Sequence, residues 1–314
     1  MKIFRDINET SIPNPVATIG IFDGVHLAHR AIIEKLNLTA KKISGESVIV
    51  TLWPHPRIIL NGKGETTKLI NTLEEKIELL ESAGVDNLVI LPFSKTFAAT
   101  SFDEFVRGIL FEKLKIGHLV VGYNHQFGKN REGNFVRLKE LSDSLGFSIE
   151  QLEPVILGED RVSSSTIRKL ISSGNIERAD ELLGYNFNLR GSVVEGKKIG
   201  TQIGFPTANV LVSSPDKIIP ANGVYAVLVR TEGIQYMGMM NIGYRPTIEE
   251  QPDKIVLEAN LINFSGDLYN KIVEVTFITK VRDEKKFNSI YELRSQIEQD
   301  RATVIKILES LKKH

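Results

Sequence analysis

The sequence predicts a two-domain protein, with an α/β domain built on a parallel sheet over residues 1–184 and an antiparallel β-barrel with a terminal helix over residues 185–314. The length of 314 residues is enough for about two domains of roughly 100–200 residues each. Before Gly184, short apolar runs alternate with amphipathic stretches. After it, strand-like runs follow one another with no helical pattern between them.

The first half contains four runs of β-branched or otherwise apolar residues that are typical of buried strands, at 16–21, 47–52, 87–91 and 118–122. Helices are predicted from about residue 30 and over 73–83, 101–114, 135–145, 164–172 and 176–183. In the stretch 73–83, Leu73, Ile77 and Leu80 share one face. Because βαβ units form parallel sheets, we expect a ligand at the carboxyl ends of the strands.

The second half contains six closely spaced strand-like runs, at 189–194, 205–211, 223–230, 235–242, 254–262 and 272–280. Closely spaced strands without intervening helices are typical of an antiparallel barrel or sandwich. A last helix is predicted over 289–311, with Ile297, Val304, Ile305 and Leu308 on its apolar face. The change of pattern at Gly184 places the domain boundary there.

The composition excludes several classes of protein. Lys and Arg number 39 and Asp and Glu also number 39, so the basic excess typical of nucleic-acid-binding proteins is missing. Cys is absent, which excludes disulfides, a thiol nucleophile and cysteine-ligated zinc. No run of 18 apolar residues and no signal-peptide pattern occurs, so we expect a cytoplasmic protein that binds no membrane.

The first candidate site follows the strand at 16–21, where the chain reads Phe22-Asp-Gly24-Val-His26-Leu-Ala-His29 before a helix. Two His three residues apart at a strand-to-helix turn can both face one group above the helix N-terminus, where backbone N–H groups favour phosphate. Imidazole N–H donors there would stabilise charge during displacement of pyrophosphate. The alternatives are a metal pair or two surface histidines. Zinc is disfavoured because the chain has no Cys and no nearby third ligand.

Three further polar segments follow predicted strands or open a helix. Trp53-Pro-His-Pro-Arg57 has an Arg suited to phosphate, Gly122–Arg131 contains Asn124 with aromatics and cations, and Ser163-Ser164-Ser-Thr-Ile-Arg168 joins hydroxyls to an Arg. Each of them alone is compatible with an ordinary capped loop. Together they lie where an α/β sheet binds its ligand.

These motifs resemble the adenylyltransferase module of the bacterial bifunctional riboflavin kinase/FMN adenylyltransferases (FAD synthetases), which have a Rossmann-like sheet and belong to the HxGH nucleotidyltransferase superfamily. The resemblance implies transfer of AMP from ATP to FMN, with His26 and His29 as the catalytic residues. It also implies six residues that bind nucleotide or phosphate: Phe22, Gly24, Arg57, Asn124, Ser164 and Arg168.

The chain departs from the family pattern at three places. Ile21 replaces the usual Asn, Ala28 replaces the usual Gly between the histidines, and Ser165-Thr166 replaces the usual Thr-Arg. A methyl group at position 28 adds bulk where ATP phosphate meets the backbone. We therefore expect reduced tolerance at this turn and retained activity.

The second candidate site is the stretch Gly196-Lys-Lys198-Ile-Gly200-Thr-Gln-Ile-Gly204-Phe-Pro-Thr207-Ala-Asn209. Glycines with lysines form a cationic loop suited to phosphates, although the spacing is not that of a Walker A loop. Thr207 and Asn209 lie two apart on a predicted strand, so their side-chain oxygens would face one side and ligate Mg²⁺. The structural alternative is a Gly/Lys hairpin followed by an ordinary strand.

Glu258 lies within the predicted strand 254–262, where a carboxylate facing the site would accept the proton of an attacking alcohol. The pattern of the strand does not determine which way Glu258 faces. Five motifs in this half resemble the riboflavin kinase module in order and spacing: Pro206–Asn209, Asn222–Tyr225, Asn241–Thr247, Leu257–Asn260 and Phe264–Tyr269. The resemblance implies Glu258 as the base, Thr207 and Asn209 as ligands of Mg²⁺ and nucleotide, and three glycine-loop residues and one arginine in binding: Gly196, Lys198, Gly204 and Arg294.

The resemblance therefore implies a bifunctional transferase that uses riboflavin, FMN and ATP with Mg²⁺. One rival is a chain in which only the kinase is active. Another is a flavin- or nucleotide-binding protein without catalysis. A nucleic-acid-binding barrel is disfavoured because the charge of the second half is near neutral. The sequence does not predict an oligomeric state.

Overall fold

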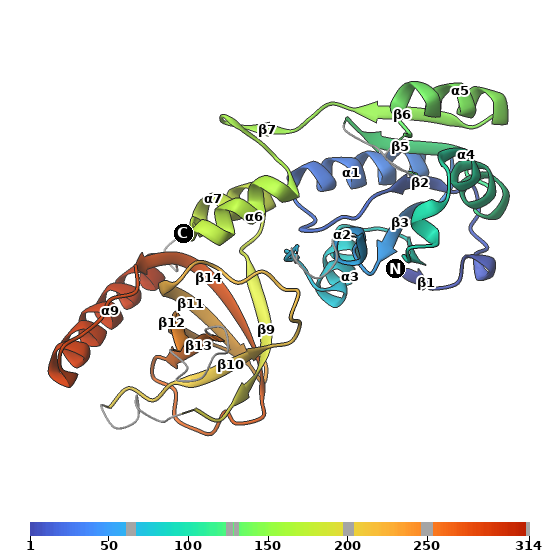
Figure 1. Ribbon diagram of the computed structural model, residues 1–314. Coiled ribbons are helices and arrows are strands. Elements are labelled where there is room, and N and C mark those ends of the chain that lie inside the picture. The colour runs from blue at the N-terminus through green and yellow to red at the C-terminus, as the bar shows by residue number, and fades with distance from the viewer. Residues whose placement is uncertain (61–66, 124–127, 129–131, 197–203, 246–253, 312–314) are drawn as a thin grey trace. The chain divides into compact units, whose positions relative to one another are not determined.

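The computed structural model describes residues 1–60, 67–123, 128, 132–196, 204–245 and 254–311. The chain divides into two compact units, Met1–Thr166 and Ile167–His314. No helix within the described ranges is both long and apolar enough to cross a lipid bilayer. The predicted combination of a parallel sheet and an antiparallel barrel is confirmed (Figure 1).

The first unit is built on a six-stranded sheet in the order β1-β4-β3-β2-β5-β6, in which every pairing is parallel. Its strands are β1 Lys2–Phe4, β2 Val16–Ile19, β3 Ser47–Trp53, β4 Asn87–Pro92, β5 His118–Gly122 and β6 Ser148–Leu152. Its α-helices are α1 Leu27–Lys42, α2 Pro56–Leu60, α3 Leu73–Ser82, α4 Phe102–Glu104 and α5 Phe135–Leu145. Shorter elements are two 3₁₀ turns, Ile7–Glu9 and Phe97–Ala99, and the paired strands β7 Ile156–Leu157 and β8 Asp160–Arg161.

Helices cover both faces of this sheet, which is why its central strands are apolar throughout. Alternate strand residues pack in two separate clusters. One cluster joins the sheet to α1 and α3 through Ile33, Leu36 and Leu80, and the other joins it to the helices after Ser101 and to α5. Burial on both faces leaves the strand ends as the positions where polar groups reach solvent.

The observed elements differ from the predicted ones at several points, and the short elements α2, β7 and β8 were not predicted. Two edge strands, β1 and β6, were not predicted, because edge strands are short and carry polar residues. The helix predicted over 101–114 begins as α4 and continues as a π-helix over Phe105–Lys113. Helix α1 begins at Leu27 and not near residue 30, because the His26 side chain caps it.

The strand order reverses beside β2, which pairs with β3 on one side and with β5 on the other. The chain adds β3 and β4 on one side of β2 and then adds β5 and β6 on the opposite side. In open α/β sheets, ligands bind outside the carboxyl ends of the strands at such a switch point. The turn that carries His26 and His29 follows β2 at this point.

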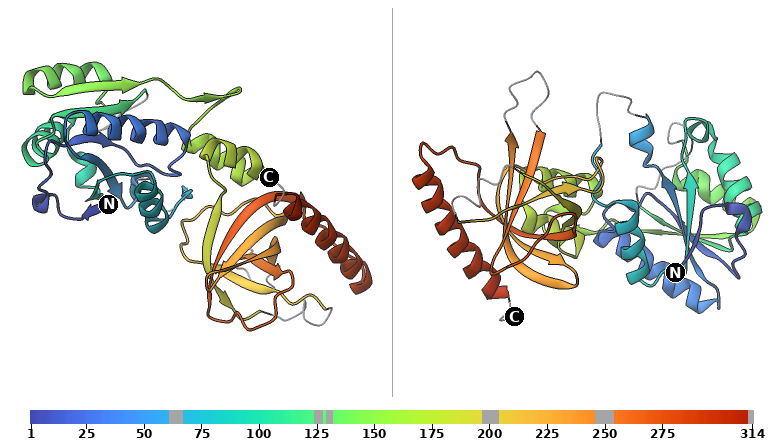
Figure 2. Two further views of the ribbon diagram at one scale, coloured as in Figure 1. Left: turned by 180° about the vertical axis from the view of Figure 1, so that it is seen from behind. Right: turned by 90° about the horizontal axis from the view of Figure 1, so that it is seen from below.

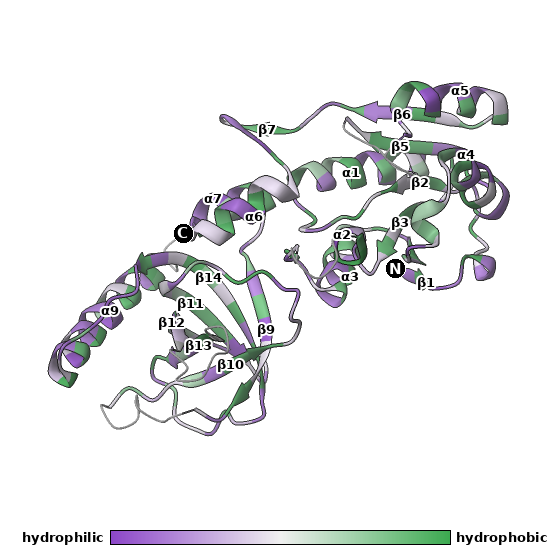
Figure 3. Ribbon diagram, in the orientation of Figure 1, coloured by the Kyte–Doolittle hydropathy of each residue, from purple (hydrophilic) through white to green (hydrophobic). Residues whose placement is uncertain are grey.

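The second unit contains a closed antiparallel barrel in the order β10-β13-β12-β11-β14-β9. Its strands are β9 Asn188–Val194, β10 Ala208–Val212, β11 Gly223–Thr231, β12 Ile234–Arg245, β13 Lys254–Leu261 and β14 Ile272–Arg282. Its helices are α6 Ser164–Ser173, α7 Ile176–Leu183 and α9 Ile290–Leu311. The first residues of α6 belong to the first unit. Helix α9 lies along one side of the barrel (Figure 2). Hydrophobic and hydrophilic stretches alternate along it (Figure 3), and Val304 and Leu308 are buried against Val224 and Ala226.

Strand β10 begins at Ala208, three residues later than predicted, so Thr207 precedes the strand. Pro206 accounts for the late start because proline has no N–H to donate to a ladder. Its carbonyl instead accepts a hydrogen bond of 2.7 Å from the Asn260 side chain. Thr207 and Asn209 therefore do not lie in one strand as the spacing predicted, although both stay predicted ligands of Mg²⁺.

Helix α7 joins the barrel through a carboxyl group that is mostly removed from solvent. Asp180 Oδ1 accepts a hydrogen bond of 2.7 Å from the Phe187 N–H. Burial, opposed by this hydrogen bond and assisted by nearby Glu177, raises the pKa of Asp180 to about 7. Between pH 4 and pH 7 the folded state therefore binds more protons at this site than the unfolded state, and stability falls as the pH rises through this window.

Asp180→Asn should stabilise the second unit at pH 8, by roughly 1–3 kcal/mol, because the amide oxygen still accepts from Phe187 and no charge is buried. The gain should shrink toward pH 4, and denaturant unfolding at both pH values measures it. Glu181→Gln, on the same helix with an exposed ion pair to Arg178, is the matched control and should change little. An equal gain at both pH values would contradict the assigned pKa.

Candidate functional site

The turn after β2 gives helix α1 an unusual N-cap. His26 precedes the first helical residue, and its Nδ1 accepts a hydrogen bond of 3.4 Å from the backbone N–H of His29. The imidazole thus occupies the place of the usual Asn, Asp or Ser cap. The two rings stack with their centroids 3.7 Å apart and their planes 12° apart. The spacing of three residues therefore brings the histidines together at the helix N-terminus, as the sequence predicted.

The cap also determines the tautomer of His26. Because Nδ1 accepts a hydrogen bond, neutral His26 carries its proton on Nε2. Nε2 lies 3.3 Å from Ser164 Oγ, and this hydroxyl donates in turn to the Asp23 carbonyl at 2.8 Å. Ser164 therefore lies at the site, and its observed contacts orient His26. Its predicted contact with nucleotide stays a prediction.

His29 is held in its neutral form. Burial, the neighbouring His26 and the charge of Lys76 all lower its pKa well below the ordinary value. Its Nδ1 is enclosed and has no hydrogen-bond partner among the described residues. Phe22 packs against the His29 ring with centroids 4.8 Å apart and is itself buried. A neutral His29 imidazole at the helix N-terminus provides an N–H donor without bringing extra charge.

The backbone of this turn is strained. Phe22 and Val25 have φ values of 52° and 34°, a region that L-residues seldom adopt, and Gly24 has a φ of 91°. Gly24 is buried, and its positive φ is one that glycine adopts without strain, while its nucleotide binding stays a prediction. The Asp23 carboxylate accepts hydrogen bonds from the N–H groups of Ile70 and Asn71. Asp23 therefore fastens the turn to the segment that leads into α3.

Sequence reasoning missed Lys76, a buried lysine close to the histidines. Lys76 is 1% exposed, and its Nζ donates to the Ile21 carbonyl at 2.7 Å. Burial, opposed by the charge of Asp23, lowers its pKa to about 8. A signal was present, because Lys76 falls within the apolar stripe of the helix that contains Leu73 and Leu80.

The other predicted residues of the first site lie at several places. Arg57 is exposed on α2, a helix that begins directly after His55. The Nδ1 atom of His55 accepts a hydrogen bond of 3.1 Å from the Arg57 N–H. Arg168 is half-buried on α6, in the second compact unit. Asn124 lies outside the described residues. Ala28, the departure from the family pattern, is the second residue of α1, where alanine suits a helix.

The barrel aligns three polar residues across neighbouring strands. In the ladders, Glu258 of β13 lies directly opposite Asn209 of β10 on one side and Asn241 of β12 on the other. Directly opposed residues of an antiparallel ladder point to the same face. Asn241 is in turn opposite Val224, which packs against α9. The three polar residues therefore lie on the outer face of the barrel that α9 partly covers, which determines the direction of Glu258.

The next row of the same strands fills the barrel interior. This row contains one buried residue from each of four neighbouring strands, and each residue lies directly opposite the next. Its members are Tyr225, Met240, Ala259 and Ala208. Because side chains alternate along a strand, the interior row and the polar row differ by one residue on each strand. The sheet thus separates its apolar core from a polar outer row.

The backbone at Gly196 closely approaches the Asn209 side chain. A Cβ at residue 196 would lie 1.9 Å from Asn209 Nδ2, so any larger residue there would displace this amide. Asn209 is buried, and Thr207 is half-buried just before β10. Lys198, predicted to bind phosphate from the same loop, lies outside the described residues.

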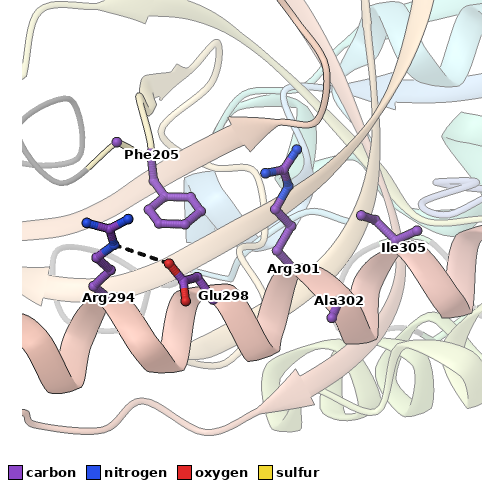
Figure 4. Close-up of a pocket in the computed structure, with 7 residues that line it drawn as sticks. Phe205, Arg294, Glu298, Arg301, Ala302 and Ile305 are labelled. Carbon is purple, nitrogen blue, oxygen red and sulfur yellow. Dashed lines mark hydrogen bonds and ion pairs between the residues drawn. The ribbon is translucent and has the colours of Figure 1, made fainter.

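A pocket of about 420 Å³ lies between the segment before β10 and helix α9. Gly204 and Arg294, both predicted binding residues, line it together. Arg294 lies on α9 next to Glu298 (Figure 4). The remaining lining residues of the pocket are Phe205, Glu298, Arg301, Ala302 and Ile305. Arg294 Nε donates to Glu298 at 3.1 Å. The pocket thus combines an aromatic ring with two guanidinium groups and one carboxylate.

Comparison with known proteins identifies the family of the chain. Residues 8–166 match the family model of FAD synthetase, and residues 183–308 match that of riboflavin kinase. The chain belongs to the bifunctional riboflavin kinase/FMN adenylyltransferase family. The FAD synthetase model covers the parallel sheet, and the riboflavin kinase model covers the barrel.

Relatives of that name cover nearly all of the chain. The protein of Haemophilus influenzae is 37% identical over 96% of this chain and 97% of its own length. That of Bacillus subtilis is 35% identical, with 95% and 94% covered. A crystal structure described as a macrolide-efflux protein from Streptococcus pneumoniae is 28% identical and superposes with a TM-score of 0.86, covering 96% of this chain and 97% of that one.

Within this family assignment, Gly196 offers a test of the barrel site. Gly196→Ala should lower FMN formation from riboflavin by about 10- to 100-fold, because its methyl group would displace the Asn209 amide. FAD formation from supplied FMN should not change. Gly117→Ala is the matched control, since a Cβ at Gly117 has no neighbour within 4 Å. Chromatographic separation of riboflavin, FMN and FAD measures both reactions, and undiminished FMN formation would refute the role of this contact.

Proposed function

We propose that the protein phosphorylates riboflavin to FMN at the barrel and adenylylates FMN to FAD at the α/β unit, using ATP in both reactions. Membership of the bifunctional family supports the pair of activities. The observation that carries the adenylyl transfer is the stacked His26–His29 pair at the switch point of the sheet. The observation that carries the kinase is the aligned row of Asn209, Glu258 and Asn241.

In adenylyl transfer, a phosphate oxygen of FMN attacks the α-phosphorus of ATP, a new P–O bond forms, and the bond to the β-phosphate breaks to release pyrophosphate. Negative charge grows on the oxygens around the α-phosphorus. The N–H donors of His26 and His29, together with the N-terminus of α1, would stabilise this charge. Because the pKa of His29 is lowered, its neutral form predominates at pH 7.

In the kinase reaction, the terminal ribityl hydroxyl of riboflavin attacks the γ-phosphorus of ATP, and ADP leaves. The Glu258 carboxylate accepts the hydroxyl proton as the new P–O bond forms. Its place between Asn209 and Asn241 supports this role, because both amides lie on the same outer face. Arg294 and Gly204 line the pocket between the segment before β10 and α9, which supports flavin or phosphate binding there.

Mg²⁺ is part of the proposal for both reactions, since it neutralises the phosphate oxygens of ATP. In the barrel, Thr207 and Asn209 would hold the ion through side-chain oxygens, and Asn209 is buried close to the Gly196 backbone. Protein sites of this kind supply one or two ligands while phosphates and water supply the rest. Among the described residues, no group of three or more His, Cys, Asp or Glu side chains is placed to hold a metal.

Two substitutions separate the activities. His29→Ala should abolish FAD formation and spare FMN formation, because it removes one of the two stacked imidazoles. Glu258→Gln should do the reverse, because an amide cannot accept the hydroxyl proton. Both variants are assayed with riboflavin and, separately, with FMN. FAD formation at the wild-type rate by His29→Ala would contradict the role of the pair, and a wild-type protein that forms FMN alone would favour an active kinase with a silent transferase.

We also propose that the transferase activity belongs to residues 1–184 and the kinase activity to residues 185–314. Helix α7 packs on β14 and buries Ile176, Ala179 and Leu182. This packing affects the stability of a separately expressed barrel. The fragment 185–314 exposes the barrel surface that α7 covers. It should form FMN and no FAD, but unfold at a lower temperature than the fragment 167–314, as measured by circular dichroism.

A further inference from the structure

Lys76 stands out among the charged residues that the proposed reactions do not use. Removing an ammonium group from water is unfavourable unless the protein supplies compensating contacts. Here the Ile21 carbonyl accepts from Nζ at 2.7 Å, and the Trp53 ring centroid lies 5.3 Å from Nζ. The side chain is 1% exposed, so Lys76 has little access to solvent.

The Ile21 carbonyl lies at the start of the strained turn that carries the histidines. Thr51 Oγ1 also donates to it, over 3.3 Å. Phe22 and Val25 follow with positive φ values, a conformation that such residues keep only where the surrounding structure holds it. Lys76 and the Asp23 carboxylate together connect both ends of this turn to α3 and the segment before it.

We propose that Lys76 is a positioning residue for adenylyl transfer: its ammonium group holds the Ile21 carbonyl, fixes the strained turn and sets the charge next to the histidine pair. The inference rests on the proposed function of His26 and His29. The titratable groups that interact electrostatically with Lys76 are Asp23 from the turn and His29 from α1. The Glu75 carboxylate of the same helix accepts a hydrogen bond from the Thr72 N–H.

The charge of Lys76 influences the pKa of His29. The positive charge of Lys76 is one of three causes that lower the pKa of His29, with burial and His26. The pKa of Lys76 itself is lowered to about 8, so its charge is lost as the pH rises through 8. Loss of this charge leaves the turn without its ionic anchor and His29 with a higher pKa.

The test compares Lys76→Met and Lys76→Arg with wild type in the full-length chain. Lys76→Met should lower kcat for FAD formation by about 10- to 100-fold with little change in the KM for ATP, because the turn is misplaced while the remaining nucleotide contacts stay. Lys76→Arg should recover part of the rate. Above pH 8 the wild-type rate should decline while that of Lys76→Arg does not, since arginine stays protonated.

Two controls accompany these variants. FMN formation in the same chain should be unchanged in both, because the barrel does not include Lys76. Lys139→Met removes an exposed lysine of α5, which pairs with Asp143, and should match wild type in both reactions.

A spectroscopic readout does not depend on activity. Trp53 is the only tryptophan of the chain, so tryptophan emission reports the surroundings of Lys76. A pH titration of wild type should show a transition near pH 8 that Lys76→Met lacks, and the pKa of His29 measured by NMR should rise in Lys76→Met. If Lys76→Met does not fold, the pH profile of Lys76→Arg and the titration of wild type test the role of Lys76.

FAD formation by folded Lys76→Met at the wild-type rate and with the wild-type pH profile would overturn the inference. So would an unchanged pKa of His29. If His29→Ala also forms FAD normally, the proposed function of the histidine pair fails as well. If His29→Ala is inactive and Lys76→Met is normal, only the role of Lys76 fails.

Discussion

The hydrogen bond from the His29 N–H to His26 Nδ1 is the contact on which the first site depends. It begins helix α1 at Leu27, stacks the two rings and determines the tautomer of His26. A helix N-terminus needs an acceptor for its free N–H groups, and a histidine that supplies this acceptor through Nδ1 carries its own proton on Nε2, here beside Ser164. One interaction therefore serves helix stability and the arrangement of donors at the switch point of the sheet.

The barrel site depends on a different constraint, the register of its ladders. Glu258 meets Asn209 and Asn241 because β13 pairs with β10 and β12 at these residues. A slip of one residue would turn Glu258 into the apolar interior and expose Ala259. The buried interior row, which includes Tyr225 and Met240, opposes such a slip. The carboxylate is thus positioned by the same packing that holds the barrel together.

Both units place charged groups where solvent is scarce, with different compensation. Lys76 has a carbonyl and an aromatic ring beside its ammonium group, whereas Asp180 has one backbone N–H beside its carboxyl group. Burial lowers the pKa of the lysine and raises that of the aspartic acid, since in each case it disfavours the charged form. The two groups therefore titrate closer to neutral pH than their types usually do.

The sequence by itself determined the order of the elements, the change from α/β to all-β, and the motifs that contain His26, His29, Asn209 and Glu258. Apolar periodicity and turn residues are properties of short segments, so they can be recognised in a single sequence. Only the tertiary structure decided that Glu258 faces Asn209 and Asn241, that Thr207 precedes its strand, and that Lys76 reaches the Ile21 carbonyl. Strand register and contacts between segments 55 residues apart depend on packing of the whole unit, which no local pattern encodes.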